Sequence, residues 1–513
     1  MGSGPEAAGD DVASLLAAKD AENVALRAEN TALLARLTEL EGMVAALRAQ
    51  LGRDSSNSGK PPSSDSPFVK KPAAKRSSRT RSGKPQGKQP GAPGATLGLV
   101  DDPDDTITHL PKVCACCGEG LRDAEIFGVR RHQVFDVPPP PPRPYVTEHR
   151  VQSRTCGGCG TVTEATAPGF VSGRVQYGPG VKARAAWLTC AHFLPVRRAR
   201  RVVNALLGFA VSDGWVAGLR AQAAGLLTDR FLPHVRALIA AAPVAHADET
   251  TARAAGALTY LHVACTAHLT AMHVGDRTTE TIDAGGIWPA FTGVLVRDGY
   301  AGYDHLDQAV HAWCGIHLVR DLRAIHDPDP QGQSWAEAMV NTLLLANDTA
   351  HTARAAGRAT LTNAELATIR SRYAGAIARG RDENITGRDP LHAQARTLLR
   401  RFERHRDMIL RFTVNLDVPF TNNTAELPAR SVKIQQRTSG GSWRTLQGLI
   451  DFAVVQSYLS TAAKWGLDTL DAMTRLFTTG AWLPPALTPN IASAHPTLHH
   501  ATKAEQLPHD LLA

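Results

Sequence analysis

The chain has 513 residues, and its 43% hydrophobic content is sufficient for a sizeable core divided among about three or four domains. No apolar run approaches the roughly 20 residues of a membrane helix, and the polar first residues show no secretory signal, so we expect a cytoplasmic protein without a membrane partner. Eight cysteines are too few for a disulfide scaffold in so long a chain.

Residues 12–51 carry a heptad repeat. Leucine at successive d positions predicts a coiled coil, and asparagine at two a positions favours two strands. A single amphipathic helix packed on its own domain is the alternative. We expect the coiled coil, and with it a homodimer. The a positions are Asn23, Asn30, Leu37, Val44 and Leu51, and the d positions are Leu26, Leu33, Leu40 and Leu47.

Residues 52–105 form a linker rich in Ser, Pro, Gly and Lys, which we expect to be disordered. Within it, residues 52–98 hold ten Lys and Arg against two Asp, so this stretch carries the whole net charge of +8. Such a basic arm indicates a polyanionic partner, most simply nucleic acid. A solvated spacer is the alternative.

Residues 106–175 contain two CxxC pairs, which predict one structural Zn²⁺ in a zinc-finger domain. Strands are expected between the pairs, at 129–137 and 145–153. A redox CxxC is the alternative, but it lacks the expected βαβ context. The four expected ligands are Cys114, Cys117, Cys156 and Cys159.

Residues 176–240 read as helices and form the expected DNA-binding region. Pro195 is expected to open one helix and Ser212 to cap the next. A helix, a short turn and a helix could read the major groove, although helical hairpins are common in other proteins. The arginines expected to contact DNA are Arg197, Arg198, Arg200 and Arg201.

Residues 241–440 hold the most informative pattern. A short apolar strand is expected to end at Asp248, and a later apolar strand ends at Asp298. Three strands, a helix and a fourth strand match the order of a ribonuclease-H-like α/β core. The expected elements are strands up to 248, at 258–266 and at 269–274, a helix at 279–291 and a strand up to 298.

A third carboxylate follows a helical insertion at 330–412, in which Thr362 and Glu365 predict a capping box at the start of a helix. Two strand-end aspartates and the later helical Glu426 form the ligand set of a two-metal phosphoryl-transfer site, for which Mg²⁺ is the expected ion. Glu249 is excluded because neighbouring strand residues point to opposite faces. Cys314 and His317 could bind metal, but a packed cysteine beside a hydrogen-bonded histidine is the favoured interpretation.

The segment 423–437 predicts a helix with Asn423 as its N-cap. Two interpretations of Glu426 are equally good on this segment alone. It could be a metal ligand, or it could complete a capping box with Asn423. Residues 441–513 are expected to form C-terminal helices and a tail. The cations that share a helical face with Glu426, and that are expected to meet phosphates, are Arg430, Lys433 and Arg437.

In their order, these motifs resemble transposases of the insertion-sequence-66 family of bacterial mobile elements. The resemblance runs almost from end to end and includes Asp-Glu-Thr at 248–250, Asp-Gly-Tyr-Ala-Gly-Tyr at 298–303 and Asn-Asn-Thr-Ala-Glu at 422–426. It implies a DDE triad of Asp248, Asp298 and Glu426. The chain departs from the family at Leu427-Pro428, where a proline is expected to kink the helix or shift its start.

The resemblance implies a multidomain α+β protein that binds terminal inverted repeats and cleaves and joins DNA with two Mg²⁺ ions. DNA, a second copy of the chain and accessory proteins of the same element are the implied partners, at the bacterial nucleoid. A non-catalytic zinc-finger DNA-binding protein, as a regulator or an inactive transposase copy, is the main alternative. A ribonuclease-H-like repair nuclease is another.

Overall fold

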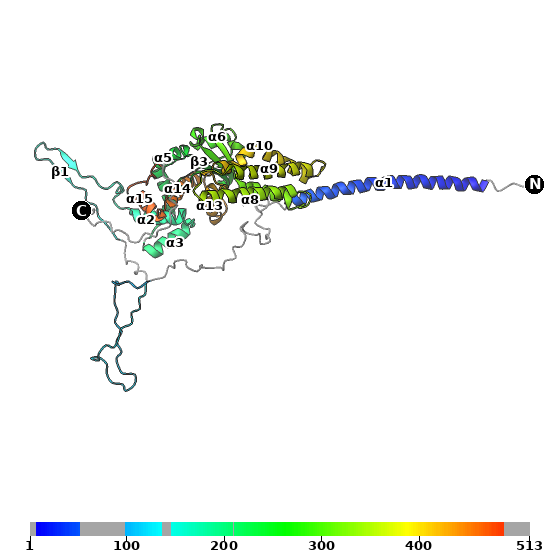
Figure 1. Cartoon of the computed structure of the whole chain (residues 1–513). Coiled ribbons are helices and arrows are strands. Elements are labelled where there is room, and N and C mark those ends of the chain that lie inside the picture. The colour runs from blue at the N-terminus through cyan, green and yellow to red at the C-terminus, as the bar shows by residue number, and fades with distance from the viewer. Residues whose placement is uncertain (1–6, 52–97, 136–144, 209, 487–513) are drawn as a thin grey trace, which may run out of the picture.

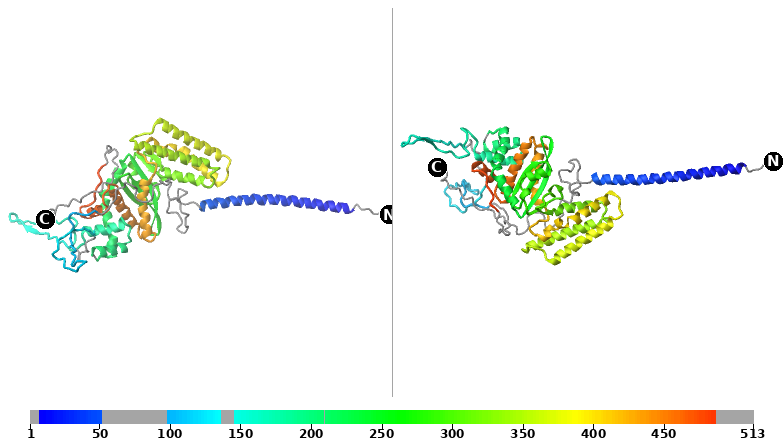
Figure 2. Two further views of the ribbon diagram at one scale, coloured as in Figure 1. Left: turned by 60° about the horizontal axis from the view of Figure 1, so that its bottom comes forward. Right: turned by 90° about the horizontal axis from the view of Figure 1, so that it is seen from above.

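The computed structural model describes residues 7–51, 98–135, 145–208 and 210–486. Figure 1 shows a body of helices around a central sheet, with the 45-residue helix α1 (Ala7–Leu51) extending away from it. Figure 2 shows the same separation from two further sides. Most of the predicted linker, residues 52–97, lies outside the described residues, as does 487–513 of the predicted tail. No described helix is both long and apolar enough to cross a membrane.

The central sheet has five strands in the order β5-β4-β3-β6-β7. The first three form an antiparallel meander, and β6 and β7 continue the sheet parallel to β3. The predicted order of three strands, a helix and a strand is therefore present, although the helix predicted at 279–291 ends at Ala284. The bounds are β3 Val244–Ala254, β4 Ala257–Cys265, β5 Thr270–Gly275, α6 Thr279–Ala284, η2 Trp288–Ala290, β6 Val294–Arg297, η3 Ala301–Tyr303 and β7 Val310–Trp313.

The prediction that the first strand ends at Asp248 is wrong, because β3 continues six residues further to Ala254. Pairing with β4 extends the strand through its polar half, and the hairpin closes at Ala255 and Gly256. Both turn residues have positive φ, 51° and 82°, as a two-residue hairpin turn requires. Asp248 thus lies inside a strand that is paired with β4 from His246 to Ala254.

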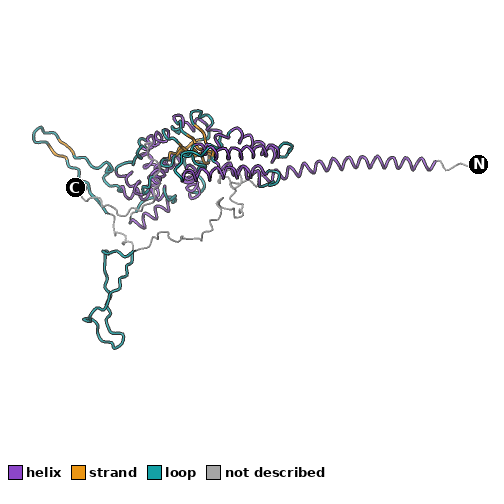
Figure 3. The backbone as a smooth tube through the Cα atoms, viewed as in Figure 1, coloured by secondary structure: helices purple, strands orange, loops and turns teal. Residues whose placement is uncertain are grey.

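Helices cover both faces of the sheet, and Figure 3 shows them surrounding the central strands. Ala245, Ala247 and Leu295 face the core formed with α2, α4, α5, α14 and α15. Val294, Val296 and Ala312 face the core formed with α7 to α12. On the first side the helices are α2 Pro179–Cys190, α3 Val196–Leu207, α4 Asp213–Thr228, α5 Phe231–Ala240, α14 Leu446–Lys464 and α15 Thr469–Thr478.

The second side contains the predicted helical insertion and the helix that carries Glu426. Thr362 caps α9 through the predicted capping box with Glu365. The bounds are α7 Gly315–His326, α8 Ser334–Ala355, α9 Asn363–Glu383, α10 Pro390–Arg404, α11 Arg406–Ile409, α12 Arg411–Val414 and α13 Asn423–Thr438.

Helix α14 covers the open edge of the sheet at β5. The Ser457 hydroxyl accepts from Met272 N at 2.9 Å, and the Thr461 hydroxyl accepts from Thr270 N at 3.0 Å. An edge strand leaves such backbone groups unpaired, and here a helix supplies their partners. Although the predicted domain boundary falls at residue 440, α14 packs as part of the layer that covers the sheet.

Candidate active site and zinc knuckles

Two aspartates meet because of the parallel register between β3 and β6. Val244 pairs with Val294 and His246 with Val296. Continuing this register by two residues brings Asp248 opposite Asp298, the residue that follows β6. Adjacent strands lie about 4.8 Å apart, so the two carboxylates are neighbours across the sheet.

The Asp248 carboxylate lies in a repulsive field. Burial raises its pKa well above the ordinary value of 3.8, and the charges of Glu249, Asp298 and Glu426 raise it further. The structure describes no hydrogen bond to this carboxylate. Glu249, in contrast, pairs with Arg277 and accepts from the Tyr303 hydroxyl at 3.3 Å. Glu249 therefore has its own partners, whereas Asp248 remains available for a ligand.

The loop after Asp298 is built on Arg297, whose side chain is only 1% exposed. Its guanidinium donates to the carbonyls of Tyr300 at 2.8 Å and Asp298 at 3.2 Å. Tyr300 N in turn donates to the Asp298 carboxylate at 2.9 Å. Arg297 is not among the predicted site residues, and its one signal in the sequence is a charged residue at the end of an apolar strand.

Glu426 is positioned by the residue that precedes α13. The N-cap is Asn422 and not the predicted Asn423, and its side chain makes no capping bond. Instead, Asn422 Nδ2 donates to Ala247 O at 2.7 Å, and Asn422 Oδ1 lies 3.0 Å from His246 Nδ1. The predicted capping box is thus absent, because the asparagine side chain is buried against β3. This contact brings Glu426 to the side of the sheet that carries Asp248.

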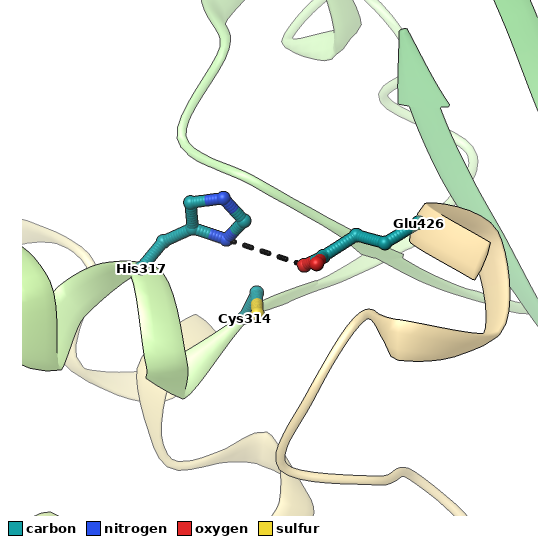
Figure 4. A group of neighbouring side chains, drawn as sticks. All are labelled: Cys314, His317 and Glu426. Atoms are coloured by element: carbon teal, nitrogen blue, oxygen red, sulfur yellow. Dashed lines mark ion pairs between the residues drawn. The ribbon is translucent and has the colours of Figure 1, made fainter. Parts of the chain in front are cut away.

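Figure 4 shows the immediate surroundings of Glu426. His317 Nδ1 lies 3.9 Å from Glu426 Oε1, and the ligand atoms of Cys314, His317 and Glu426 all lie within 4.8 Å of one another. Burial opposes the charged form of His317, but the Cys314 side chain, Glu426 and Asp298 outweigh it and raise its pKa to about 9. Cys314 and His317 therefore border the carboxylate site directly.

Pro428 does not break α13, which runs continuously from Asn423 to Thr438. A proline supplies no amide, so the carbonyl of Thr424, four residues earlier, loses its usual helical donor. The Cys265 thiol of β4 donates to that carbonyl at 3.1 Å. A partner from the sheet thus replaces the missing bond, and the expected later start of the helix does not occur.

The cations predicted to bind DNA differ in their surroundings. In α3, Arg200 pairs with Asp213 at 2.7 Å and Arg197 lies 3.8 Å from the same carboxylate, whereas Arg198 and Arg201 are exposed and have no described ion pair. Pro195 precedes α3, and Ser212 caps α4 as predicted. Their short connection preserves the predicted helix, turn and helix.

On α13, Arg430 and Arg437 are exposed, but Lys433 turns inward. Its ammonium donates to the carbonyl of Thr251 and, at 2.7 Å, to the Thr251 hydroxyl. Burial and the nearby Arg437 lower the pKa of Lys433 to about 8. Lys433 therefore fastens α13 to β3 in this structure.

The two CxxC pairs fold into the same turn on separate loops. Gly118 N donates to Cys114 O at 3.0 Å, and Gly160 N donates to Cys156 O at 2.9 Å. Both glycines have positive φ, 77° and 74°, which favours glycine at each position. This shared geometry makes each pair a ready-made knuckle for two metal ligands.

Hydrogen bonds lower the pKa of two knuckle thiols, chiefly from the Cys117 amide in the case of Cys114 and from the Thr161 hydroxyl in the case of Cys159. The thiolate is the form that binds zinc, so both knuckles fit that ion. Within the described residues, however, the four sulfur atoms do not all come within 4.8 Å of one another.

The strands predicted around the knuckles are wrong for the described parts of 129–137 and 145–153. Short strands instead precede and follow the second knuckle, β1 at Ser153–Thr155 and β2 at Val162–Glu164. Val129, Val134 and Tyr145 are more than three-quarters exposed. No second layer from the described part of the chain covers these apolar side chains, so the expected strands lack a packing partner there.

Models of known families match three parts of the chain. The model described as Transposase IS66 family matches residues 174–449, more than half of the chain. The chain belongs to the IS66 transposase family. The zinc-finger binding domain of transposase IS66 matches residues 111–160, and a family of unknown function matches residues 15–97. A comparison with curated proteins found no match.

The transposase match includes Asp248, Asp298 and Glu426, and the zinc-finger match includes all four knuckle cysteines. The family therefore supports a transposase with a DNA-binding zinc finger and a structural zinc. The earlier resemblance, drawn from the order of short motifs, is confirmed at the level of the family.

We expect the two knuckles of freshly purified transposase to hold one Zn²⁺ per chain between them. Cys114→Ser removes one of the four thiolates and should lower the zinc content measured by atomic emission. Cys116→Ser, which changes the exposed neighbouring cysteine, is the matched control and should retain the zinc. Equal zinc in both variants would contradict the four-cysteine assignment.

The bond between Cys265 and the Thr424 carbonyl predicts a coupling with Pro428. Cys265→Ala leaves a buried carbonyl unpaired and should lower the free energy of unfolding by about 1–3 kcal/mol. In a Pro428→Ala background, the backbone amide gained at position 428 can donate to the Thr424 carbonyl. Cys265→Ala should then lower the free energy of unfolding by about 1 kcal/mol less than it does with proline present. Denaturant unfolding of the four proteins measures the difference.

The buried thiol of Cys190 provides the control for this cycle. Cys190→Ala should lower the free energy of unfolding by the same amount with proline or alanine at position 428. The described hydrogen bond of the Cys190 thiol is to Thr189, which is not part of α13. A Cys265→Ala cost that is unaffected by residue 428 would mean that the thiol does not replace the missing helical bond.

Proposed function

We propose that this IS66-family transposase cleaves DNA at the ends of its element and joins them to a target, with Asp248, Asp298 and Glu426 as the catalytic triad. The register that sets Asp248 opposite Asp298 is the observation that carries this proposal. Glu426 joins them because Asn422 ties the start of α13 to β3.

The sheet supports a ribonuclease-H-like core. Three antiparallel strands are followed by two parallel ones, and the helix with the third carboxylate packs on β3 and β4. In this arrangement the insertion of α8 to α12 separates Asp298 from Glu426 in the chain while leaving both at the same side of the sheet. The proposed core thus accounts for the long spacing between the carboxylates.

The donor set fits Mg²⁺, which favours carboxylate oxygens. Asp248, Asp298 and Glu426 would hold two ions, which when bound supply an activated nucleophile and stabilise the leaving oxygen. Asp248 is suited to this role because its half-buried carboxylate lies among like charges and has no described hydrogen-bond partner. Arg297 and the Tyr300 amide keep the Asp298 carboxylate in place.

DNA binding is proposed to combine the zinc knuckles, the linker and exposed cations. Arg198 and Arg201 on α3, with Arg430 and Arg437 on α13, have exposed side chains that could meet phosphates. Arg197 and Arg200 would first have to leave Asp213, and Lys433 would have to leave Thr251. The basic arm at 52–97 lies outside the described residues.

A homodimer through α1 is proposed from the exposed heptad. The described d-position leucines Leu26, Leu33 and Leu40 are 49%, 57% and 51% exposed on a helix that extends away from the body (Figure 1). A row of leucines in water is unfavourable, and pairing two such helices would bury it. A paired transposase could bring two element ends together.

We expect Asp248→Asn and Asp298→Asn each to lower Mg²⁺-dependent cleavage of a terminal-repeat duplex by at least about a hundredfold, because each removes a charged ligand. Binding of the same duplex should change little, since neither carboxylate is needed to attract phosphates. Cleavage on a gel and binding by fluorescence anisotropy separate the two effects.

Thermal unfolding in EDTA is the control for the fold. Asp248→Asn should not lower the midpoint, because it removes a buried carboxylate from a repulsive field. If Asp248→Asn and Asp298→Asn both cleave the duplex at the wild-type rate, the proposed catalytic triad is wrong. DNA binding without cleavage by the unchanged protein would instead favour the non-catalytic DNA-binding alternative.

We expect light scattering to give twice the mass of one chain for the full protein and the mass of one chain after removal of residues 1–51. Leu33→Lys places a charge in the proposed seam and should also give the single-chain mass. Ala35→Lys lies two positions further along, on the outer side of the heptad, and should remain dimeric. Equal masses for the full and shortened chains would exclude pairing through α1.

A further inference from the structure

We propose that Cys314, His317 and Glu426 form a binding site for a thiophilic divalent transition metal, with Zn²⁺ as the best-fitting ion. The site differs in chemistry from the all-carboxylate set proposed for Mg²⁺. It shares Glu426 with the proposed catalytic triad and rests on that proposal in no other respect.

Two elements bring the three ligands together. Cys314 is the N-cap of α7, and His317 lies three residues later, so both project from the same face of one helical turn. Glu426 approaches from the first turn of α13 (Figure 4). The sequence spacing suggested a pair of ligands, which is too few for a site, and the fold supplies the third.

The separations suit a tetrahedral ion. Zinc bonds of about 2.0–2.3 Å place two tetrahedral ligand atoms about 3.3–3.8 Å apart. His317 Nδ1 and Glu426 Oε1 are 3.9 Å apart, and all three ligand atoms lie within 4.8 Å of one another. Among the described residues, this is the one group of three or more His, Cys, Asp or Glu that meets this limit.

Two polar atoms of the cluster form a long ion pair but lack hydrogen-bond partners. His317 Nδ1 and Glu426 Oε1 are both inaccessible to solvent and make no hydrogen bond. Leaving such an atom without a hydrogen bond costs about 1–3 kcal/mol. Most buried polar atoms in proteins therefore contact a protein group, a water molecule or an ion. At 3.9 Å the two atoms are too far apart for a hydrogen bond to each other, but a metal ion between them could coordinate both.

The surroundings hold the ligands in place. Asn422 N donates to Cys314 Sγ at 3.2 Å, a supporting bond of the kind that orients metal ligands. Gly315 N donates to Phe420 O at 2.8 Å, and a side chain at Gly315 would collide with the Phe420 ring. The start of α7 is therefore fixed against the segment that leads into α13.

The ligand types select the ion. A thiolate and an imidazole favour Zn²⁺ and related transition metals, whereas Mg²⁺ takes oxygen ligands. Three protein ligands leave a fourth position open for water or a DNA oxygen. Because Glu426 belongs to both sets, a transition metal at this site and Mg²⁺ at the carboxylates would compete for the same side chain.

Cobalt binding tests the site without any measurement of activity. The probe is Co²⁺ added to full-length protein whose knuckles already hold zinc, and the readout is the thiolate-to-cobalt absorbance. We expect about one equivalent of Co²⁺ to bind with this signal, and Cys314→Ser to abolish it. His317→Ala and Glu426→Gln should weaken binding by at least about tenfold.

Matched variants make the result specific. Cys116→Ser alters another thiol, and Asp248→Asn alters the proposed Mg²⁺ set, so both should keep the cobalt signal. If Asp248→Asn abolishes DNA cleavage but keeps the cobalt absorbance, the cobalt site does not depend on the proposed Mg²⁺ site. Because Cys314 is buried and its replacement could harm folding, His317→Ala, whose side chain is 21% exposed, provides the second test.

Two outcomes would overturn the proposal. One is no cobalt absorbance in the zinc-loaded wild-type protein. The other is unchanged Co²⁺ affinity in folded His317→Ala. Either would mean that His317 only forms an ion pair with Glu426. The sequence alone favoured a packed cysteine beside a hydrogen-bonded histidine, without Glu426.

Discussion

The buried side chain of Asn422 connects the three segments that carry the site. Its amide bonds to the backbone of β3 beside Asp248, its carbonyl oxygen contacts His246, and its own backbone amide donates to Cys314. A buried amide with fewer partners would be costly, so the segments are constrained together. The position of Glu426 relative to Asp248 depends on these bonds more than on the helix that bears it.

The site concentrates negative charge on half-buried side chains, which opposes folding in the absence of a ligand. Burial raises the pKa of Asp248 most, and repulsion by the neighbouring carboxylates raises it further. Neighbouring contacts offset the cost, since Arg277 pairs with Glu249 and Arg297 anchors the loop after Asp298. The scaffold thus neutralises the carboxylates around the triad and leaves Asp248 itself unpaired.

The helical insertion reaches the same loop and is not a detached module. Arg401 of α10 pairs with Asp321 of α7 at 3.1 Å, and its guanidinium lies so close to Gly299 that any side chain there would collide with it. Gly299 directly follows Asp298. Movement of the insertion on binding DNA would therefore act on the loop that carries the second aspartate.

The sequence by itself determined the family, the carboxylate candidates, the CxxC pairs and the local caps at Ser212 and Thr362. These signals depend on residue types in a fixed order, or on bonds within a single helical turn, which a linear pattern records. The folded chain decided the length of β3, the inward turn of Lys433 and the donor that satisfies the helix at Pro428. The last two depend on contacts between residues more than 150 positions apart, such as that between Cys265 and Thr424, and local periodicity carries no information about them.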